Sequence, residues 1–302
     1  MKTKLLVVST VRDVSKTIRN DIKILRKALC PRFDTYWLFV ESDSADNTLS
    51  VLQQICLNDP TMRFISLGNL SSTLHHREAR LAYCRNIYMH EIDYHDAYQH
   101  IPYVFVADCD GINNHLTASS VDSCFNNGQK WDACFPNQKG PYHDIYALRH
   151  QTWNPICVTR QLEFFTAINV DIASSYRLAL YSRMITIPLN NDWIEVASAF
   201  GGCAFYRLEA IRGKRYSCLE NGRLVCEHVP FHHQLVQSGC SLYINPLFIN
   251  SRINMHNRPS LFPWRVFLQC PRILRYRRAS LQNRLISRFR SLIDSISAIF
   301  SM

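Results

Sequence analysis

The first 110 residues alternate between short apolar segments and longer segments in which apolar residues recur at helical spacing. The apolar segments lie at 5–8, 36–40, 62–67 and 103–107. The helical segments between them begin near Ser15, Asp46 and His75. Strands that alternate with helices indicate a mainly parallel sheet with helices on both faces. The sequence therefore predicts an α/β fold.

The pattern loosens after residue 110. Segment 135–141 contains two prolines and a glycine, which is typical of a turn. Buried strands are expected at 196–206, where Gly201 and Gly202 interrupt the apolar run, and at 241–244.

Two carboxylates, Asp108 and Asp110, directly follow the fourth apolar segment with one residue between them. In strand geometry, side chains two residues apart share a face. At the carboxyl end of a strand, such a pair can hold a hard divalent cation that also contacts phosphate oxygens. The same pattern also occurs in solvated turns. Its position after a buried strand favours a site for a hard divalent cation.

The composition indicates a globular cytosolic protein. The chain has 302 residues, 47% of them hydrophobic, enough for one large α/β domain or two small ones. No apolar run reaches the length of a transmembrane helix, and the apolar stretch after Lys4 is too short for a signal peptide. The twelve cysteines are scattered singly, without a Cys-x-x-Cys pair, so we expect reduced, mostly buried thiols rather than disulfides or a zinc site.

The positive charge is concentrated at the end of the chain. From Asn250 onward there are ten arginines and one acid, Asp294, so this segment carries nearly all of the net charge of +10. From Leu281, apolar residues recur at helical spacing, which predicts a basic amphipathic helix. Such a helix can lie on an anionic membrane leaflet. It can also be a plain packed helix or, as the least favoured alternative, bind nucleic acid.

Segment 41–48 contains three acids and three hydroxyl residues at the end of the second predicted strand. Such groups can cap a helix, contact a ribose or base, or do both. The chain has only nine glycines, with neither a Gly-x-Gly-x-x-Gly fingerprint nor a P-loop, so two common nucleotide-binding folds are disfavoured.

Several motifs together resemble those of nucleotide-sugar glycosyltransferases of the GT-A fold. In chain order they are Val40–Thr48 (VESDSADNT), Arg80 with Arg85-Asn86, Asp108-Cys109-Asp110, Phe200–Tyr206 and Cys226–Val229. Segment 40–48 is most similar to the fungal capsular α-mannosyltransferase group and its bacterial relatives. The resemblance spans roughly residues 5–250. It implies a GT-A domain over 1–250, with a nucleotide-binding half (1–110) and an acceptor half (111–250), and leaves the Arg-rich tail 251–302 outside.

The resemblance also implies a donor site. Asp108 and Asp110 are expected to bind Mn²⁺ or Mg²⁺ bridging the donor diphosphate, and the metal to stabilise charge on the leaving nucleotide. Glu41 and Asp43 are expected to contact the nucleoside.

Further donor contacts are expected from the first strand and from the third helix. Thr10 and Arg12 would line the same pocket, although Arg12 can equally be a surface cation. Arg85 would reach toward the diphosphate, because guanidinium suits phosphate. Alternatively, Arg80 and Arg85 form salt bridges on a helix face.

Later motifs suggest the catalytic groups. Gly201 and Gly202 are expected to allow close approach by the sugar, or else to form a β-bulge. Glu227 is the candidate general base of an inverting enzyme, or an acceptor-positioning group in a retaining one. His256 is the candidate third metal ligand, with His228 as its rival.

One further acid and the acceptor complete the expectations. Asp144 would meet sugar hydroxyls or cap a local helix. The acceptor is expected to be a glycan or a lipid-linked glycan, and the enzyme to lie peripherally at the inner face of a membrane.

Taken with the resemblance, these features predict a metal-dependent transferase that moves a hexose from a nucleotide sugar in surface polysaccharide synthesis. The resemblance alone implies mannose, from GDP-mannose, as the donor sugar. One alternative is a sugar nucleotidyltransferase, which would show a glycine-rich loop that is absent between Val8 and Lys16. The other is a non-catalytic basic module that binds membrane or nucleic acid through its arginines.

Overall fold

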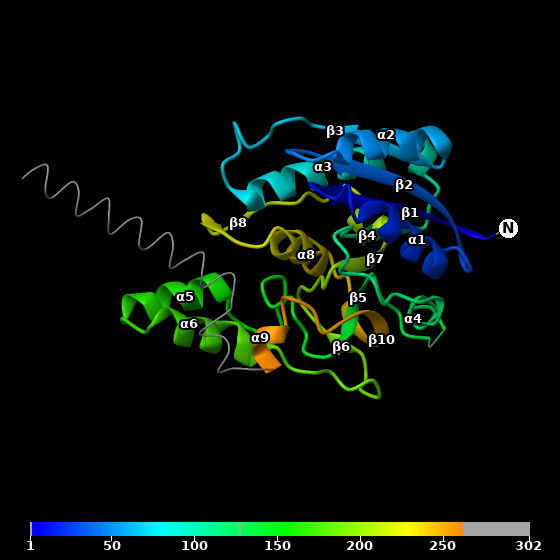
Figure 1. Cartoon of the computed structure of the whole chain (residues 1–302). Coiled ribbons are helices and arrows are strands. Elements are labelled where there is room, and N and C mark those ends of the chain that lie inside the picture. Colours follow the sequence, from blue (N-terminus) through cyan, green and yellow to red (C-terminus); the bar gives the residue numbers. More distant parts are fainter. Residues whose placement is uncertain (1, 127, 262–302) are drawn as a thin grey trace, which may run out of the picture.

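A mixed, mainly parallel sheet forms the centre of the computed structural model, which describes residues 2–126 and 128–261. In this part of the chain, eight strands pair in the order β3-β2-β1-β4-β7-β5-β10-β6 (Figure 1). In that order they span Met62–Ser66, Phe33–Glu41, Thr3–Val11, Tyr103–Ala107, Cys203–Arg207, Ala133–Lys139, Leu242–Arg252 and Ile194–Glu195. Only β7 and β6 run antiparallel to their neighbours in this described sheet. The α/β fold with a mainly parallel sheet is therefore confirmed.

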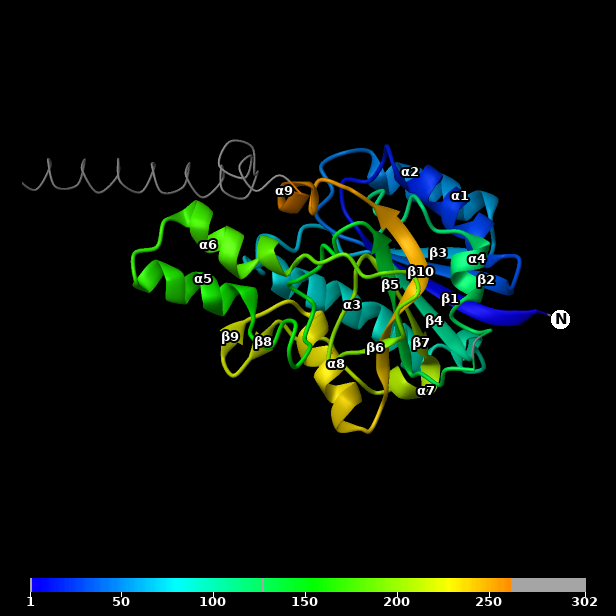
Figure 2. The ribbon, with the colours of Figure 1, turned by 90° about the horizontal axis from the view of Figure 1, so that it is seen from below.

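Helices cover both faces of the sheet (Figure 2). They are α1 (Ile18–Leu29), α2 (Thr48–Asn58), α3 (Arg77–Tyr94), α4 (Ala118–Asp122), α5 (Val158–Ala167), α6 (Ile172–Ala179), α7 (Leu208–Ile211), α8 (His228–Gln237) and α9 (Arg258–Leu261). Two 3₁₀ turns, η1 (Asp96–Tyr98) and η2 (Tyr181–Arg183), and a small hairpin of β8 (Leu219–Glu220) and β9 (Arg223–Leu224) complete the described elements.

The apolar core lies in two layers because strand side chains alternate between faces. On β1, Leu5 and Val7 pack with α1, α2 and α4, whereas Leu6 and Val8 pack with α3 and α8. A strand buried on both faces reads as a continuous apolar run, which explains why the sequence marks β1 so clearly.

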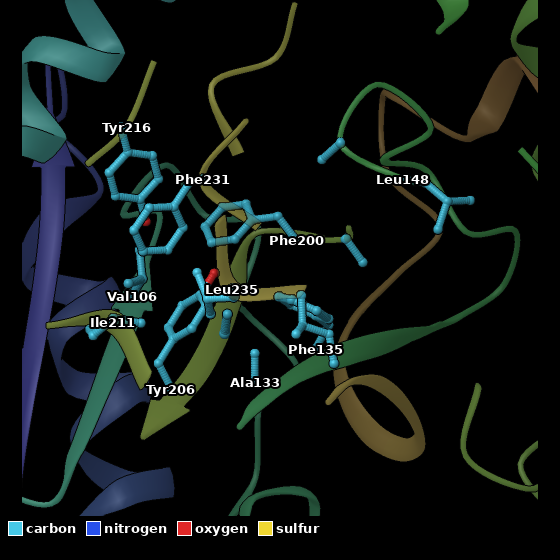
Figure 3. Packing of buried hydrophobic residues seen from close by; sticks show 14 of the residues in the cluster. Val106, Ala133, Phe135, Leu148, Phe200, Tyr206, Ile211, Tyr216, Phe231 and Leu235 are labelled. Atoms are coloured by element: carbon cyan, nitrogen blue, oxygen red, sulfur yellow. The ribbon is translucent and has the colours of Figure 1, made fainter. Parts of the chain in front are cut away.

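The layer beneath α8 is rich in aromatic rings (Figure 3). The rings of Tyr216 and Phe231 stack with centroids 4.0 Å apart. Phe200 lies in the same cluster and reaches it from the loop before β7. Of these three residues, Phe200 lines the candidate cavity described below.

The turn predicted at 135–141 is wrong, because most of this segment belongs to β5. Pro136 cannot donate a hydrogen bond, but β5 pairs with β7 only through Ala133 and Cys134. On its other side, β10 is irregular between Ile244 and Ile249, which lie opposite residues 135 and 137. A proline fits a strand at such an irregularity.

Strand bounds also differ in the second half of the chain. Within predicted strand 196–206, only residues from Cys203 onward form β7, since Gly201 and Gly202 turn the chain with positive φ. The predicted strand 241–244 continues as β10 to Arg252. Strands from both halves of the chain thus join one sheet.

Most of the Arg-rich tail, including the amphipathic helix predicted from residue 281, lies outside the described residues. Among residues 2–126 and 128–261, no helix combines the length and the apolarity needed to cross a membrane.

Candidate functional site

A cavity of about 730 Å³ opens at the carboxyl ends of β1, β2 and β4. It brings together most of the residues singled out in the sequence, namely Thr10, Arg12, Asp43, Arg85, Asp108, Asp110, Gly202, Glu227 and His256. Its other wall comes from α3, residues 143–146 and the segment that leads into α8. Ligands of open α/β sheets bind in a crevice of this kind, at the carboxyl ends of the strands.

A network of buried amides holds the backbone where Asp108 leaves β4. The Asp108 amide donates to the Gly202 carbonyl oxygen at 2.9 Å. Asn113 Nδ2 donates to the carbonyl oxygens of Asp108 and Gly202, both at 2.9 Å. Asn250 Nδ2 in turn donates to Asn113 Oδ1 at 2.7 Å and to the Gly201 carbonyl oxygen at 2.8 Å. Strand ends from both halves of the chain therefore fix the start of the carboxylate pair.

The two glycines are required by the packing of the protein itself. Gly201 and Gly202 have φ of +72° and +100°, a region that favours glycine. A Cβ on Gly202 would lie 2.6 Å from Ile112 Cγ2, and one on Gly201 would lie 2.9 Å from Gln138 Nε2. Gly202 lines the cavity, whereas Gly201 does not. The glycine pair forms a turn before β7 and not the β-bulge that was weighed as the alternative.

Arg85 is buried between Glu227, the catalytic candidate, and Asp108, a candidate metal ligand. Its Nε donates to Glu227 Oε1 at 3.0 Å, and its Nη2 lies 3.6 Å from Asp108 Oδ1. The guanidinium also lies over the rings of Phe200 and Tyr216, 5.2 Å and 5.6 Å from their centroids. The salt-bridge alternative therefore describes Arg85 here, and its ion pairs join α3 to β4 and to the start of α8.

Arg80 also forms a salt bridge, with Asp43. Arg80 Nε lies 3.7 Å from Asp43 Oδ2, and Asp43 Oδ1 accepts a hydrogen bond from the Ser71 amide at 2.7 Å. Burial acts to raise the pKa of Asp43, but the hydrogen bonds from Ser71, Ser42 and the charge of Arg80 hold it below its usual value. Asp43 is thus an oriented, ionised carboxylate at the cavity wall.

Glu41 supports the loop after β2 from behind the cavity. It is buried, and its carboxylate accepts hydrogen bonds from the Ser66 hydroxyl at 2.5 Å and from the Ser44 amide at 3.2 Å. It does not line the cavity. The helix cap weighed for this segment is only partly present: Asn47 is the N-cap residue of α2 but makes no side-chain cap hydrogen bond, whereas Asp46 Oδ1, one residue earlier, accepts from the Thr48 amide at 2.9 Å.

The carboxylates make the cavity floor electrostatically unfavourable for further negative charge. Burial raises the pKa of the Asp108 carboxyl to about 7, against the opposing effect of Arg85. Three more carboxylates add to this rise: Asp110, Glu227 and Asp144. The Asp108 side chain keeps 34% of its surface exposed, so a ligand can reach it. Hard oxygen ligands with excess negative charge suit Mn²⁺ or Mg²⁺.

The expected trio of metal ligands is not assembled. Among the described residues, no three Asp, Glu, His or Cys side chains come together closely enough to hold a metal ion. His256 lines the cavity, and its ring lies 5.6 Å from that of His143 in a stacked arrangement. Asp108 and Asp110 can therefore supply part of a coordination sphere, which water and phosphate oxygens would complete.

His228, the rival ligand, is a buried neutral imidazole. Burial and the charge of Arg85 lower its pKa well below the usual value. Its ring stacks on Phe200 at 3.9 Å, and its Nε2 lies 3.7 Å from Glu227 Oε1. It packs the wall beside Glu227.

The remaining expected residues lie at the rim or within loops. Thr10 and Arg12 line the cavity, and Arg12 forms an exposed ion pair with Asp13 at 3.5 Å. Asp144 also lines the cavity, and its Oδ2 accepts a hydrogen bond from the Gly201 amide at 2.9 Å. Sequence reasoning missed Arg77, which lines the cavity from the first turn of α3.

The chain is similar in fold to solved glycosyltransferase structures. The first 349 residues of TarS from S. aureus match at 13% identity over 80% of this chain and 58% of that chain, with a TM-score of 0.43. A mannosyltransferase from Pyrobaculum calidifontis, in complex with GDP-Man and Mn²⁺, matches at 12% identity over 83% and 57%, with a TM-score of 0.46. Glucosyl-3-phosphoglycerate synthase from Mycobacterium tuberculosis, in complex with UDP, matches at 12% identity over 83% and 69%, with a TM-score of 0.38.

This chain spans less than two thirds of the length of the first two structures. No protein-family model matches it, and no curated protein matches it by sequence.

Proposed function

We propose that this protein is a metal-dependent glycosyltransferase that moves a hexose from a nucleotide sugar to a glycan or lipid-linked acceptor. The observation that carries the proposal is the single cavity at the carboxyl ends of β1, β2 and β4. It gathers Asp108, Asp110 and Glu227 from segments far apart in the chain.

The donor would lie along these strand ends. Thr10, Arg12 and Asp43 would contact the nucleoside, since they end β1 and β2 at one side of the cavity. Asp108 and Asp110 would hold the divalent cation, which neutralises charge on the departing nucleoside diphosphate. Because the charges of Asp110, Glu227 and Asp144 raise the pKa of Asp108, a bound cation would relieve this repulsion.

Glu227 is the group proposed to act on the acceptor. Its Oε1 is held by Arg85 at 3.0 Å, and its Oε2 lies 3.8 Å from Cys226 Sγ. A carboxylate oriented in this way can accept the proton of an acceptor hydroxyl or position that hydroxyl by a hydrogen bond. Arg85 acts through Glu227 as a positioning residue.

The donor sugar and the role in polysaccharide synthesis are proposed from the sequence resemblance, and the location from the charge of the last residues. Segment 40–48 favours a mannose donor, GDP-mannose, and a role in surface polysaccharide synthesis. The basic residues after 250 favour a peripheral location at the inner face of a membrane, close to a lipid-linked acceptor.

Donor turnover tests the metal site. Asp110→Asn removes one cation ligand with little change in shape, so Mn²⁺-dependent hydrolysis or transfer of the donor should fall by about two orders of magnitude or more. Asp192→Asn, an exposed position outside the cavity, is the matched control and should retain activity. Undiminished turnover in Asp110→Asn would refute the metal assignment.

A further inference from the structure

The α5–α6 pair projects from the body as a helical hairpin in both views of the ribbon (Figures 1 and 2). It carries a group of large apolar side chains with high exposed fractions. These are Ile156 (48%), Phe164 (59%), Ile168 (54%) and Leu178 (42%). Exposed apolar side chains gathered on one projecting element are a sign of an interaction surface.

Phe164 and Ile168 lie toward the connection between α5 and α6, whereas Leu178 lies at the base of the hairpin and Ile156 just before α5. The inner side of the hairpin is already used, because Ala173 and Ala179 are buried and Phe165 packs against the main core. Phe164 and Ile168 are four residues apart, and Arg160 precedes Phe164 by the same interval. Residues at this spacing share a helix face, so an arginine and two apolar residues lie in one row.

The charges of the hairpin itself balance, because residues 158–179 contain two arginines, Arg160 and Arg177, and two acids, Glu163 and Asp171. Glu163 also lies 3.6 Å from Arg223. The described chain ends at α9, which packs against η2 directly after α6. The following residues, 262–302, contain eight arginines and a single acid. In the sequence, the basic segment therefore directly follows an element that contacts η2, next to the base of the hairpin.

We propose that the α5–α6 hairpin inserts its apolar side chains into the interface of an anionic lipid bilayer. Apolar residues that enter the headgroup region and arginines that attract anionic lipids together give stable peripheral binding. The hairpin is thus a lipid contact separate from the tail helix expected from the sequence.

The hairpin also begins at the cavity. Thr159, in the first turn of α5, lines the cavity together with Leu224 and Val225 of the β8–β9 segment. Docking of the hairpin would hold this rim at the lipid surface, where a lipid-linked sugar acceptor could enter without leaving the bilayer. This last step rests on the proposed function.

Vesicle flotation of the full chain tests the proposal. With vesicles of equal parts phosphatidylcholine and phosphatidylglycerol, Phe164→Glu/Ile168→Glu should lower the partition coefficient by about tenfold or more, because two inserted apolar side chains are lost. Leu57→Glu/Tyr94→Glu is the matched control. Both are exposed apolar positions, at 85% and 68%, and α2 lies well apart from the hairpin (Figure 1). The partition coefficient of the control variant should fall only by the effect of its two added negative charges.

Equal binding of the hairpin variant and the control would overturn the proposal, as would a wild-type chain that does not float with the vesicles. A dimer in sedimentation equilibrium that dissociates in the hairpin variant would also overturn it, since the face would then bind a second copy. Nucleotide binding in solution is measured in parallel. Hairpin variants should retain it, so failure of the lipid contact and failure of the donor site are distinguishable.

Discussion

Replacing Arg85 by methionine should destabilise the protein strongly, although the volume of the side chain is largely kept. Arg85 is 3% exposed and pairs with Glu227 at 3.0 Å and with Asp108 at 3.6 Å. Its loss leaves the buried carboxylate of Glu227 and the partly exposed carboxylate of Asp108 without their cation. Removal of one partner of a buried ion pair costs about 3–5 kcal/mol. The lost contacts with Phe200 and Tyr216 add to that cost.

Urea unfolding at pH 7.5 of the wild type, Arg85→Met, Glu227→Gln and the double variant measures the coupling between Arg85 and Glu227. Arg85→Met/Glu227→Gln should be more stable than the sum of the single variants predicts, by about 2 kcal/mol, because the second change removes the orphaned charge. Arg32→Met is the control for a surface pair, since Arg32 and Asp122 are 34% and 43% exposed, and it should cost at most about 1 kcal/mol. Additive single and double variants, or an Arg85→Met cost as small as that of Arg32→Met, would refute the role given to Arg85.

Two further predictions concern residues that support the site, Gly202 before β7 and the buried His232 of α8. Gly202→Ala should lower the unfolding free energy by about 2 kcal/mol more than Gly213→Ala. Both glycines have positive φ, but of the two only Gly202 has a neighbour that the new Cβ would meet, Ile112 Cγ2 at 2.6 Å. Equal urea midpoints of the two variants would contradict this prediction. Burial lowers the pKa of His232 to about 3, with further lowering by His233 and Arg85. The folded pKa lies below the unfolded value, so the stability that this residue supplies is present above about pH 6.5 and is lost as the pH falls toward 3. Between pH 7.5 and 5 the wild type should lose about 2 kcal/mol more than His232→Gln, and parallel pH profiles would exclude this contribution.

The sequence predicts the first half of the fold because local signals there agree. The strands β1 to β4 are short apolar runs, and α1 repeats Ile18, Ile22, Leu25 and Leu29 along one buried face. The carboxylate pair could be located for the same reason, since it directly follows a recognisable strand. In the second half, β5 could not be predicted because it contains Pro136, which is unusual in a strand. Pro136 fits there only because β10, a strand more than a hundred residues away in the sequence, is irregular opposite it.

Which site residues contact one another could be seen only in the tertiary structure. Arg85 and Glu227 are 142 residues apart, so no local spacing indicates that they pair. The amide network of Asn113 and Asn250 likewise joins residues 137 positions apart. One signal was available, since Asn250 is a polar side chain within an apolar stretch of the last strand. A buried amide in such a place needs partners, which here hold Asp108.

The central claim is that the cavity binds a nucleoside diphosphate through a cation held by Asp108 and Asp110. Thermal unfolding of the full chain with GDP, UDP and GDP-mannose, each with and without Mn²⁺, tests it most directly. A ligand present at about a hundred times its dissociation constant stabilises the folded state by about 2.7 kcal/mol, so a rise of several degrees in Tm is expected. We predict such a rise with at least one nucleotide only when Mn²⁺ is present, its loss in Asp110→Asn and its retention in Asp192→Asn. No rise with any nucleotide, or a rise that persists in Asp110→Asn, would contradict the account.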